Sequence, residues 1–308
     1  MRPSLVCFVL TLAISATASA EPTDPLERAA EAYASFETDI SAITAAQVSD
    51  ADTMDGVLTS AARHDPADLS RGWIAYAALA ATQSPTFVRG VQARVRAAGR
   101  APVLRQLMRD ATYARRRPGG SAEAIGMVLA TMSADAARLT AAADRYDRLS
   151  DQLQLNAPFA SPDDAHRADR DQRLRITNPP ALPTAIAARL HVAPAAAPLT
   201  DATAFGSAHF WDTLAGLAPV NATPMHARAD RQAFTDRVLT LAGLSIVGAT
   251  TQSNARIDAL LDDASSRDCL HVQQLEFRQC ASVSHTPDED AACLARHGLR
   301  GVAACLSF

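Results

Sequence analysis

The amino-acid sequence predicts an all-α protein, and three features point to this fold class. Apolar residues are mostly Ala and Leu, which favour helices. No segment shows the apolar alternation or the enrichment in β-branched residues that strands need. Several boundaries join a capping side chain to a proline at the first helical position: Asp65-Pro66, Ser84-Pro85, Thr223-Pro224 and Thr286-Pro287. We therefore expect a multi-helix array or bundle.

The first twenty residues have the layout of a secretory signal peptide. A basic start is followed by an apolar run over residues 5–14, and small residues occupy the positions of Ala18 and Ala20. We expect cleavage after Ala20, so that the mature chain begins at Glu21. The apolar run is shorter than the roughly 20 residues needed to span a bilayer, so we expect no integral membrane span. These features indicate a periplasmic or secreted protein.

Residues 21–155 are predicted to form an N-terminal helical region. Asp50, Asp52 and Asp55 lack the ligand spacing of a calcium loop and are interpreted as a solvated helix boundary. Trp73 and Tyr76 are three residues apart, share a helix face and are expected in the core. The expected helices cover Leu26–Ile43, Pro66–Thr82, Pro85–Ala98, Pro102–Arg115 and Ala122–Leu155.

Residues 156–198 are predicted to be a proline-rich linker or an irregular wrap. Seven prolines interrupt this mixed-charge stretch, and one short helix is expected over Thr184–His191. A C-terminal helical region follows over residues 199–308. Its uncharged stretch Val238–Ala249 is interpreted as part of a core helix. The helices expected before the cysteines cover Asp201–Leu217, Met225–Gly248 and Asn254–Asp263.

Composition excludes several classes of function. The formal net charge is −4, and it becomes −5 when a signal peptide containing Arg2 is removed. This balance is unlike that of nucleic-acid binders, so we expect no nucleic-acid partner. All 29 basic residues are Arg. The absence of Lys excludes Schiff-base chemistry, a Walker phosphate lysine and the Ser-x-x-Lys acyl-enzyme pair.

No sequence motif specifies catalysis or a cofactor. The serine in Gly243–Gly248 lacks the glycine that a hydrolase elbow needs two residues later. Glu123 and Glu276 are interpreted as helix-surface residues, and His209 as a core or boundary residue beside two aromatic residues. The basic run Arg115–Arg117 is interpreted as a solvated loop, with contact to an anionic envelope polymer or lipid as the alternative. We therefore assign no catalytic, cofactor-binding or metal-binding residues.

The four cysteines beyond the signal peptide all lie in the last forty residues: Cys269, Cys280, Cys293 and Cys305. An even number in an exported chain predicts disulfides. A first helix through Cys269 and Cys280 is expected to run antiparallel to a second that starts with the capping box at Thr286 and stops at Gly298. Of three possible connectivities, this hairpin favours Cys280 with Cys293 and Cys269 with Cys305.

A zinc site completed by nearby histidines is the alternative interpretation of these cysteines. His271, His285 and His297 lie close by in the sequence. The cysteines, however, lack the close C-x2-C pairs of structural zinc sites, and an oxidising compartment favours disulfides. The spacings C-x10-C and C-x11-C resemble those of twin-cysteine helical hairpins, although Gly298 and Gly301 are expected to break the second arm. That resemblance implies geometry and no activity.

The stretch Gly72–Leu79, together with the cysteine tail, resembles a group of exported proteins of GC-rich Gram-negative bacteria without a known activity. The resemblance implies export and carries no site residues. The sequence therefore leads to one functional hypothesis and one alternative. The first is an exported non-catalytic envelope protein that serves as a protein-interaction or scaffold module, its partner being another envelope protein. The alternative is a hydrolase of envelope polymers with an unrecognised active site.

The signal-peptide interpretation predicts the mass of the mature protein. Expression in a bacterium with a secretory system should yield a chain that begins at Glu21, because Ala18 and Ala20 occupy the small-residue positions before the cut. Intact-mass spectrometry of the purified protein measures this directly. A mature chain that retains Cys7 would contradict the interpretation.

Overall fold

The computed structural model confirms the all-α class, and no strand occurs among the residues that it describes. These residues are 24–156, 164–191, 193–195, 204–220, 222, 232–250 and 255–307. The predicted signal peptide lies outside them, as does the predicted start at Thr223-Pro224. Within the described part of the chain, no helix combines the length and the apolar character needed to cross a membrane.

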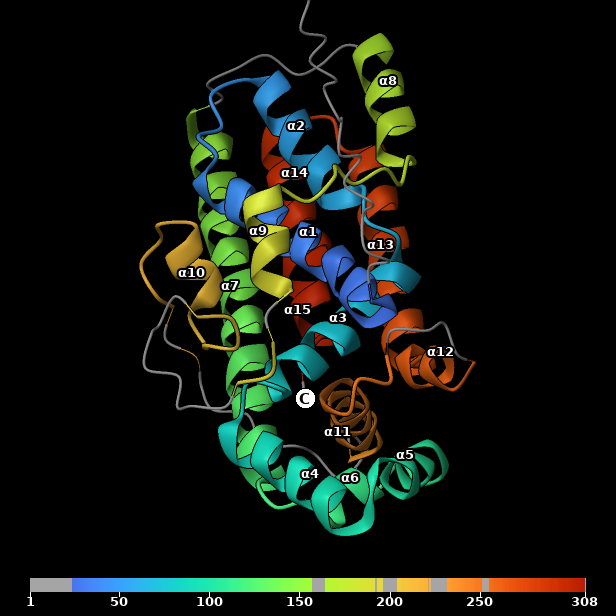
Figure 1. Cartoon of the computed structure of the whole chain (residues 1–308). Helices are drawn as coiled ribbons and strands as arrows, with labels where there is room; N and C mark the ends of the chain where they lie inside the picture. The colour runs from blue at the N-terminus through green and yellow to red at the C-terminus, as the bar shows by residue number, and fades with distance from the viewer. Residues whose placement is uncertain are drawn as a thin grey trace, which may run out of the picture.

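The first half of the chain forms seven helices of very different length (Figure 1). The starts at Pro66 and Pro85 are confirmed, because Asp65 accepts the backbone N–H groups of Ala67 and Asp68, and Ser84 accepts that of Phe87. The helices are α1 (Pro25–Ala45), α2 (Ala51–Ala62), α3 (Pro66–Ala81), α4 (Pro85–Ala98), α5 (Arg100–Arg109), α6 (Tyr113–Arg116) and α7 (Ser121–Asn156).

The second half contains shorter helices and then the cysteine-bearing hairpin. Figure 1 shows α4, α5 and α6 gathered at one end of the molecule and α8 at the other. The elements are α8 (Asp164–Leu174), α9 (Thr184–Leu190), α10 (Phe210–Leu214), α11 (Gln232–Ile246), α12 (Ala255–Leu261), α13 (Ala264–Val283), α14 (Pro287–Cys293), the π-helix η2 (Leu294–Gly301) and α15 (Val302–Cys305).

The centre of the molecule is the contact between α1 and α3. Helix α3 is rich in alanine and buries most of its residues, with Trp73 and Tyr76 fully buried, as expected. Gly72 allows the close approach of the two helices, because a Cβ atom there would lie 2.7 Å from the backbone nitrogen of Tyr33. Helices α7, α11 and α13 pack around this pair.

Several predicted elements differ from the observed ones. The helix expected over Pro102–Arg115 is interrupted, because the Asp110 carboxylate accepts hydrogen bonds from the backbone N–H and the hydroxyl of Thr112. Only Phe210–Leu214 is α-helical in the described part of the segment expected at 201–217, since Ser207 accepts the N–H of His209 and the chain there forms turns. Helices α2 and α8 were not predicted.

The expected helix at Thr184–His191 is present as α9, and Val238–Ala249 belongs largely to the buried helix α11, as expected. Residues from all three predicted regions contribute to one cluster of buried hydrophobic side chains, for example Leu139, Leu190 and Leu244. The division of the chain at residues 156 and 198 stays a prediction.

The α1–α3 contact predicts an effect of Gly72→Ala. The new Cβ would lie 2.7 Å from the Tyr33 nitrogen and 2.8 Å from the Ala29 oxygen. Both are backbone atoms, so the helices must separate, and we expect a loss of about 1–3 kcal/mol in the free energy of unfolding. Urea unfolding measures this. The control is Gly126→Ala, an exposed position of α7 with no atom within 4 Å of the new Cβ, which should gain up to about 1 kcal/mol. Equal effects of the two changes would contradict the close-contact explanation.

Candidate functional site

Two disulfides fix the C-terminal hairpin, and their pairing is the predicted nested one. Cys280 is bonded to Cys293 near the turn, and Cys269 to Cys305 at the open end, with a Cα–Cα distance of 5.6 Å in each pair. On α13 the two cysteines are eleven residues apart, which at about 100° per residue leaves them within about 20° of one face. Because all four thiols are used, none is available as a zinc ligand.

The second arm of the hairpin does not end at Gly298, contrary to the prediction. It continues as the π-helix Leu294–Gly301 and then as Val302–Cys305. In an uninterrupted α-helix, the twelve residues from Cys293 to Cys305 would turn the second cysteine about 120° away from the first. A π-helix has more residues per turn, so it rotates less per residue. The π segment therefore turns both cysteines toward α13.

Gly298 does not break this arm, and its lack of a side chain allows close packing there. A Cβ atom there would lie 3.0 Å from a methyl carbon of Leu294 and 3.5 Å from the ring of Phe277. Phe277 belongs to α13 and is buried. The glycine therefore lets the second arm approach the first closely, and its sequence signal as a helix terminator was misleading.

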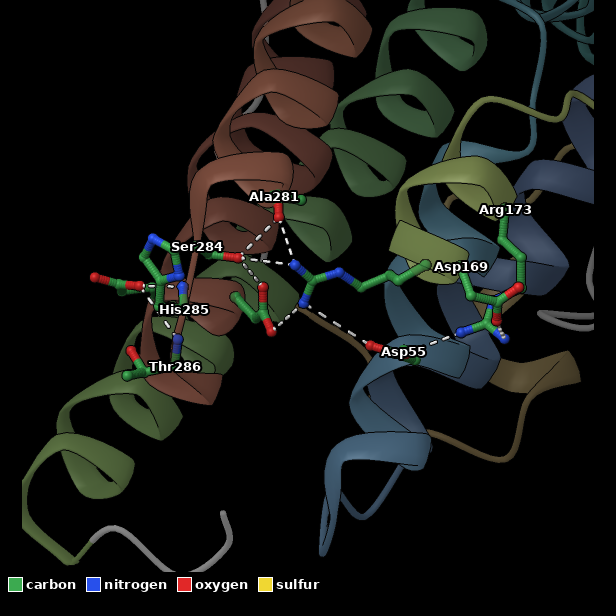
Figure 2. Close-up of polar contacts among 10 residues, drawn as sticks. Asp55, Asp169, Arg173, Ala281, Ser284, His285 and Thr286 are labelled. Carbon is green, nitrogen blue, oxygen red and sulfur yellow. Dashed lines mark hydrogen bonds and ion pairs between the residues drawn. The ribbon is translucent and has the colours of Figure 1, made fainter. Parts of the chain in front are cut away.

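A buried arginine ties this hairpin to the proline-rich segment (Figure 2). Arg170 of α8 is fully buried and binds Asp290 of α14 at 2.8 Å. It also donates to the carbonyl oxygen of Ala281 at 2.7 Å and to the Ser284 hydroxyl at 3.4 Å. Ser284 in turn donates to Asp290. We call these residues, with Asp55 and Arg173, the Arg170 network.

Asp55 belongs to this network and not to a solvated boundary. It is 4% exposed, lies 4.0 Å from Arg170 and binds Arg173 at 2.9 Å. The prediction was right for Asp50, an exposed N-cap whose carboxylate accepts the N–H of Thr53. It was wrong for Asp55 because helix α8, which supplies both arginines, was not predicted. The Arg170 network thus joins α2, α8, α13 and α14.

Burial changes the protonation of Asp290. Its removal from water raises its pKa from 3.8 to about 6, against the opposing hydrogen bonds from Ser284 and Arg170. The nearby Asp55 carboxylate raises the pKa further. The Arg170 network therefore takes up a proton in mildly acidic solution.

A second buried ionic cluster joins α1, α7 and α10. Arg138 of α7 pairs with Glu37 and, at 2.8 Å, with Asp212, and all three side chains are almost fully buried. Tyr33 donates to Asp135 at 3.0 Å. Burial raises the pKa of Asp135 well above its usual range and also raises that of Glu37. No sequence signal marks this cluster, because its members are ordinary helix residues.

Three exposed aliphatic side chains form a stripe on the outer side of α13. Val272, Leu275 and Val283 are 48%, 50% and 65% exposed, and at helical spacing they lie within about 80° of one another. At helical spacing Cys269 and Cys280 lie about 90° around α13 from the middle of this stripe, so the second arm lies beside it. We call these three residues the α13 stripe. Val283 also lines a pocket of about 250 Å³, together with Cys280, Ser284, Glu289, Ala292, Cys293 and Arg296.

His64 forms a further polar centre beside a surface pocket. Its Nε2 atom lies 2.7 Å from the Asp39 carboxylate, which Arg63 also binds. Although burial opposes the change, hydrogen bonds from His64 and Arg63 lower the pKa of Asp39. The pocket measures about 200 Å³ and is lined by Ala32, His64, Asp65, Asp68, Leu69, Thr177 and Pro179. This centre was not predicted, because Asp39 and His64 are distant in sequence and form no motif.

Several other residues singled out from the sequence have structural partners. His209 lies 3.7 Å from Asp212 beside the Arg138 cluster. In the basic run, Arg115 binds Asp236 of α11 at 2.6 Å, so one of its three charges joins two helices. Among the described residues, no group of three His, Cys, Asp or Glu is arranged to hold a metal ion. His297 binds Glu276 at 3.2 Å.

Comparison with protein-family models, with curated proteins and with solved structures finds no match to this chain.

The raised pKa of Asp290 predicts how stability depends on pH. The folded state holds the proton of Asp290 more tightly than the unfolded state does. The contribution of this carboxyl group to the free energy of unfolding is therefore full below about pH 4 and is lost as the pH rises through about 6. A difference of two pKa units between the folded and unfolded states corresponds to roughly 3 kcal/mol in the free energy of unfolding. Between pH 4 and 7 the wild type should therefore lose about this much stability relative to Asp290→Asn.

Urea unfolding at constant ionic strength measures that difference. The control is Asp288→Asn on the same turn of α14, outside the Arg170 network, which should show no such change. A difference between the wild type and Asp290→Asn that stays constant from pH 4 to 7 would contradict the role of burial.

Proposed function

We propose that this chain is an exported, non-catalytic binding protein of the cell envelope, and that the α13 stripe holds another envelope protein. The observation that carries the proposal is an exposed aliphatic stripe on a helix that two disulfides fix to the second arm. Disulfides form and persist in oxidising compartments. This agrees with the signal-peptide pattern and supports an exported location.

Rigidity is the physical reason for placing the binding site on α13. Binding loses affinity when loops and side chains must be ordered, and a preorganised surface avoids part of that loss. Besides the disulfides, Gln274 of α13 donates to the carbonyl oxygens of Ala62 and His64, at 3.1 and 2.7 Å. The Arg170 network holds the end of the same helix. An amphipathic helix of the partner is the shape that suits this narrow stripe.

The alternative, a hydrolase of envelope polymers, receives less support from the geometry. It requires an acid or base that faces a pocket large enough for a sugar or peptide. Glu37, Asp135 and Asp212 converge, but they are almost fully buried around Arg138. His64 lines a pocket of about 200 Å³, which is smaller than the roughly 300–1,000 Å³ typical of ligand sites. A pocket of about 530 Å³ has one carboxylate among its lining residues, Asp144, and this group is bound to Arg300 at 2.7 Å.

The binding function predicts a crosslink from the outer side of α13. A photoreactive benzoylphenylalanine in place of Gln279, which is exposed on the same side as the α13 stripe, should crosslink to one envelope protein in intact cells. Mass spectrometry identifies that protein. With the purified pair, the double variant Val272→Ser and Leu275→Ser should weaken binding at least about tenfold, because each aliphatic side chain contributes on the order of 1 kcal/mol.

The matched control is Leu155→Ser, which removes an 82% exposed aliphatic side chain from α7. It should leave binding unchanged. Equal loss of binding in the control and the double variant, or no loss in either, would contradict the assignment of the α13 stripe. Far-ultraviolet circular dichroism verifies that all the variants remain helical.

A further inference from the structure

The helices at one end of the molecule are strongly basic, although the protein as a whole is acidic. Residues 85–120, which include α4, α5 and α6, contain nine arginines and a single acidic residue, Asp110. The rest of the chain contains 20 arginines and 32 acidic residues. Figure 1 shows the three helices along the lower end of the molecule. We call residues 85–120 the basic end.

More than half of these arginines have no partner in the described fold. Arg115 and Arg116 each bind one aspartate, at 2.6 and 2.7 Å. Arg89 interacts electrostatically with Glu123. Arg100 donates to two carbonyl oxygens at the C-terminal end of α11, and its charge offsets the negative end of that helix. The arginines that form neither a hydrogen bond nor an ion pair with the described residues are Arg94, Arg96, Arg105, Arg109 and Arg117.

The unpaired arginines of α5 lie on its outer face. The buried residues of this helix are Val103 and Leu107. At about 100° per residue, Arg105 and Arg109 lie about 40° apart and about 160° from the centre of that buried pair. Both are exposed, as is Arg96 of α4. These guanidinium groups therefore face solvent and hold no part of the described fold together.

We propose that the basic end binds the surface of a membrane that is rich in anionic phospholipids. A guanidinium group has five donors in a planar fork and meets a phosphate through two parallel hydrogen bonds. Each basic side chain close to an anionic lipid surface strengthens binding roughly fivefold. Because the arginines are spread over three helices and not along one groove, they suit a broad layer of phosphates.

A pocket in the basic end favours a lipid over a purely polar anion. It measures about 280 Å³ and is lined by Gln92, Val95, Arg96, Arg100, Ile246 and Val247. Its wall therefore combines guanidinium groups with aliphatic side chains. A phospholipid has the matching character, because its phosphate adjoins an apolar part.

The basic end lacks the aromatic side chains with which proteins bind single-stranded nucleic acids. Its aromatic residues are Phe87 and Tyr113, and both are buried. Neither is available to stack on a base. This observation also favours lipid phosphates as the anion.

Sedimentation of the full mature chain with vesicles tests the proposal. The protein should bind vesicles of equal parts phosphatidylglycerol and phosphatidylcholine, and it should not bind vesicles of phosphatidylcholine alone. Raising the salt concentration from about 0.1 M to about 1 M should release it, because the Debye length falls from about 10 to about 3 Å. Heparin, a soluble polyanion without an apolar part, is the third probe.

Two double variants distinguish the basic end from a general effect of charge. Arg105→Gln with Arg109→Gln should weaken binding to the anionic vesicles at least about tenfold. The matched control is Arg148→Gln with Arg175→Gln, which makes the same change in net charge at exposed positions without a described partner. It should leave binding nearly unchanged. Arg148 lies about 40 Å along α7 from the start of that helix, and Figure 1 shows α8, which Arg175 follows, at the opposite end of the molecule.

Absence of binding to the anionic vesicles would overturn the proposal, and binding of heparin alone would assign a soluble polyanion as the ligand instead. Equal loss of binding in the two double variants, or no loss in either, would also overturn it. Far-ultraviolet circular dichroism verifies that both variants remain helical. The measurement requires no partner protein, so its outcome is independent of the α13 stripe.

Discussion

A guanidinium group that is withdrawn from water must meet opposite charge and hydrogen-bond acceptors, and this constraint decides which helices of the protein lie together. Arg138 and Arg170 are each 4% exposed or less. Arg138 brings α7 against α1 and α10 through Glu37 and Asp212. Arg170 does the same for α8, α13 and α14 through Ala281 and Asp290. Removing one partner of such a buried pair typically costs about 3–5 kcal/mol, so these contacts specify the arrangement strongly.

The chain's composition explains why arginine has this role. A core rich in alanine allows helices to approach closely but offers few large side chains to distinguish one contact from another. With no lysine in the sequence, every buried cation is a planar guanidinium, whose five donors can reach a carboxylate and a carbonyl together. Arg170 uses its group in this way, with a carboxylate on one side and a backbone oxygen on the other.

The sequence predicted correctly those features that depend on residues close together in the chain. The caps before Pro66 and Pro85, the nested disulfides and the buried Trp73 follow from neighbouring residues or from one helical hairpin. Helix α8 was missed because most of its residues are charged or polar and Leu174 is its only large apolar side chain, so it shows no apolar period. Gly298 was misjudged because its close contact with Phe277 comes from the other arm.

The candidate sites could not be predicted either, because their residues come together only through contacts between distant segments. His64 and Asp39 are separated by 25 residues, and Asp65 and Asp68 look like ordinary first-turn acids of α3. Only the tertiary fold converts them into one pocket. The α13 stripe is likewise indistinguishable from core-facing aliphatic residues until the opposite side of the helix is seen to be covered.

The hairpin combines three kinds of constraint on a single helix. The disulfides limit its separation from the second arm, and the π-helix supplies the rotation that lets both bonds form. The Arg170 network fixes its end, and Gln274 fixes its middle to the loop that carries His64. Because Gln274 donates to the carbonyl oxygen of His64 itself, the helix that carries the α13 stripe is fixed to the loop between α2 and α3. Under the proposed function, a partner would therefore meet a surface on α13 that is already ordered before binding.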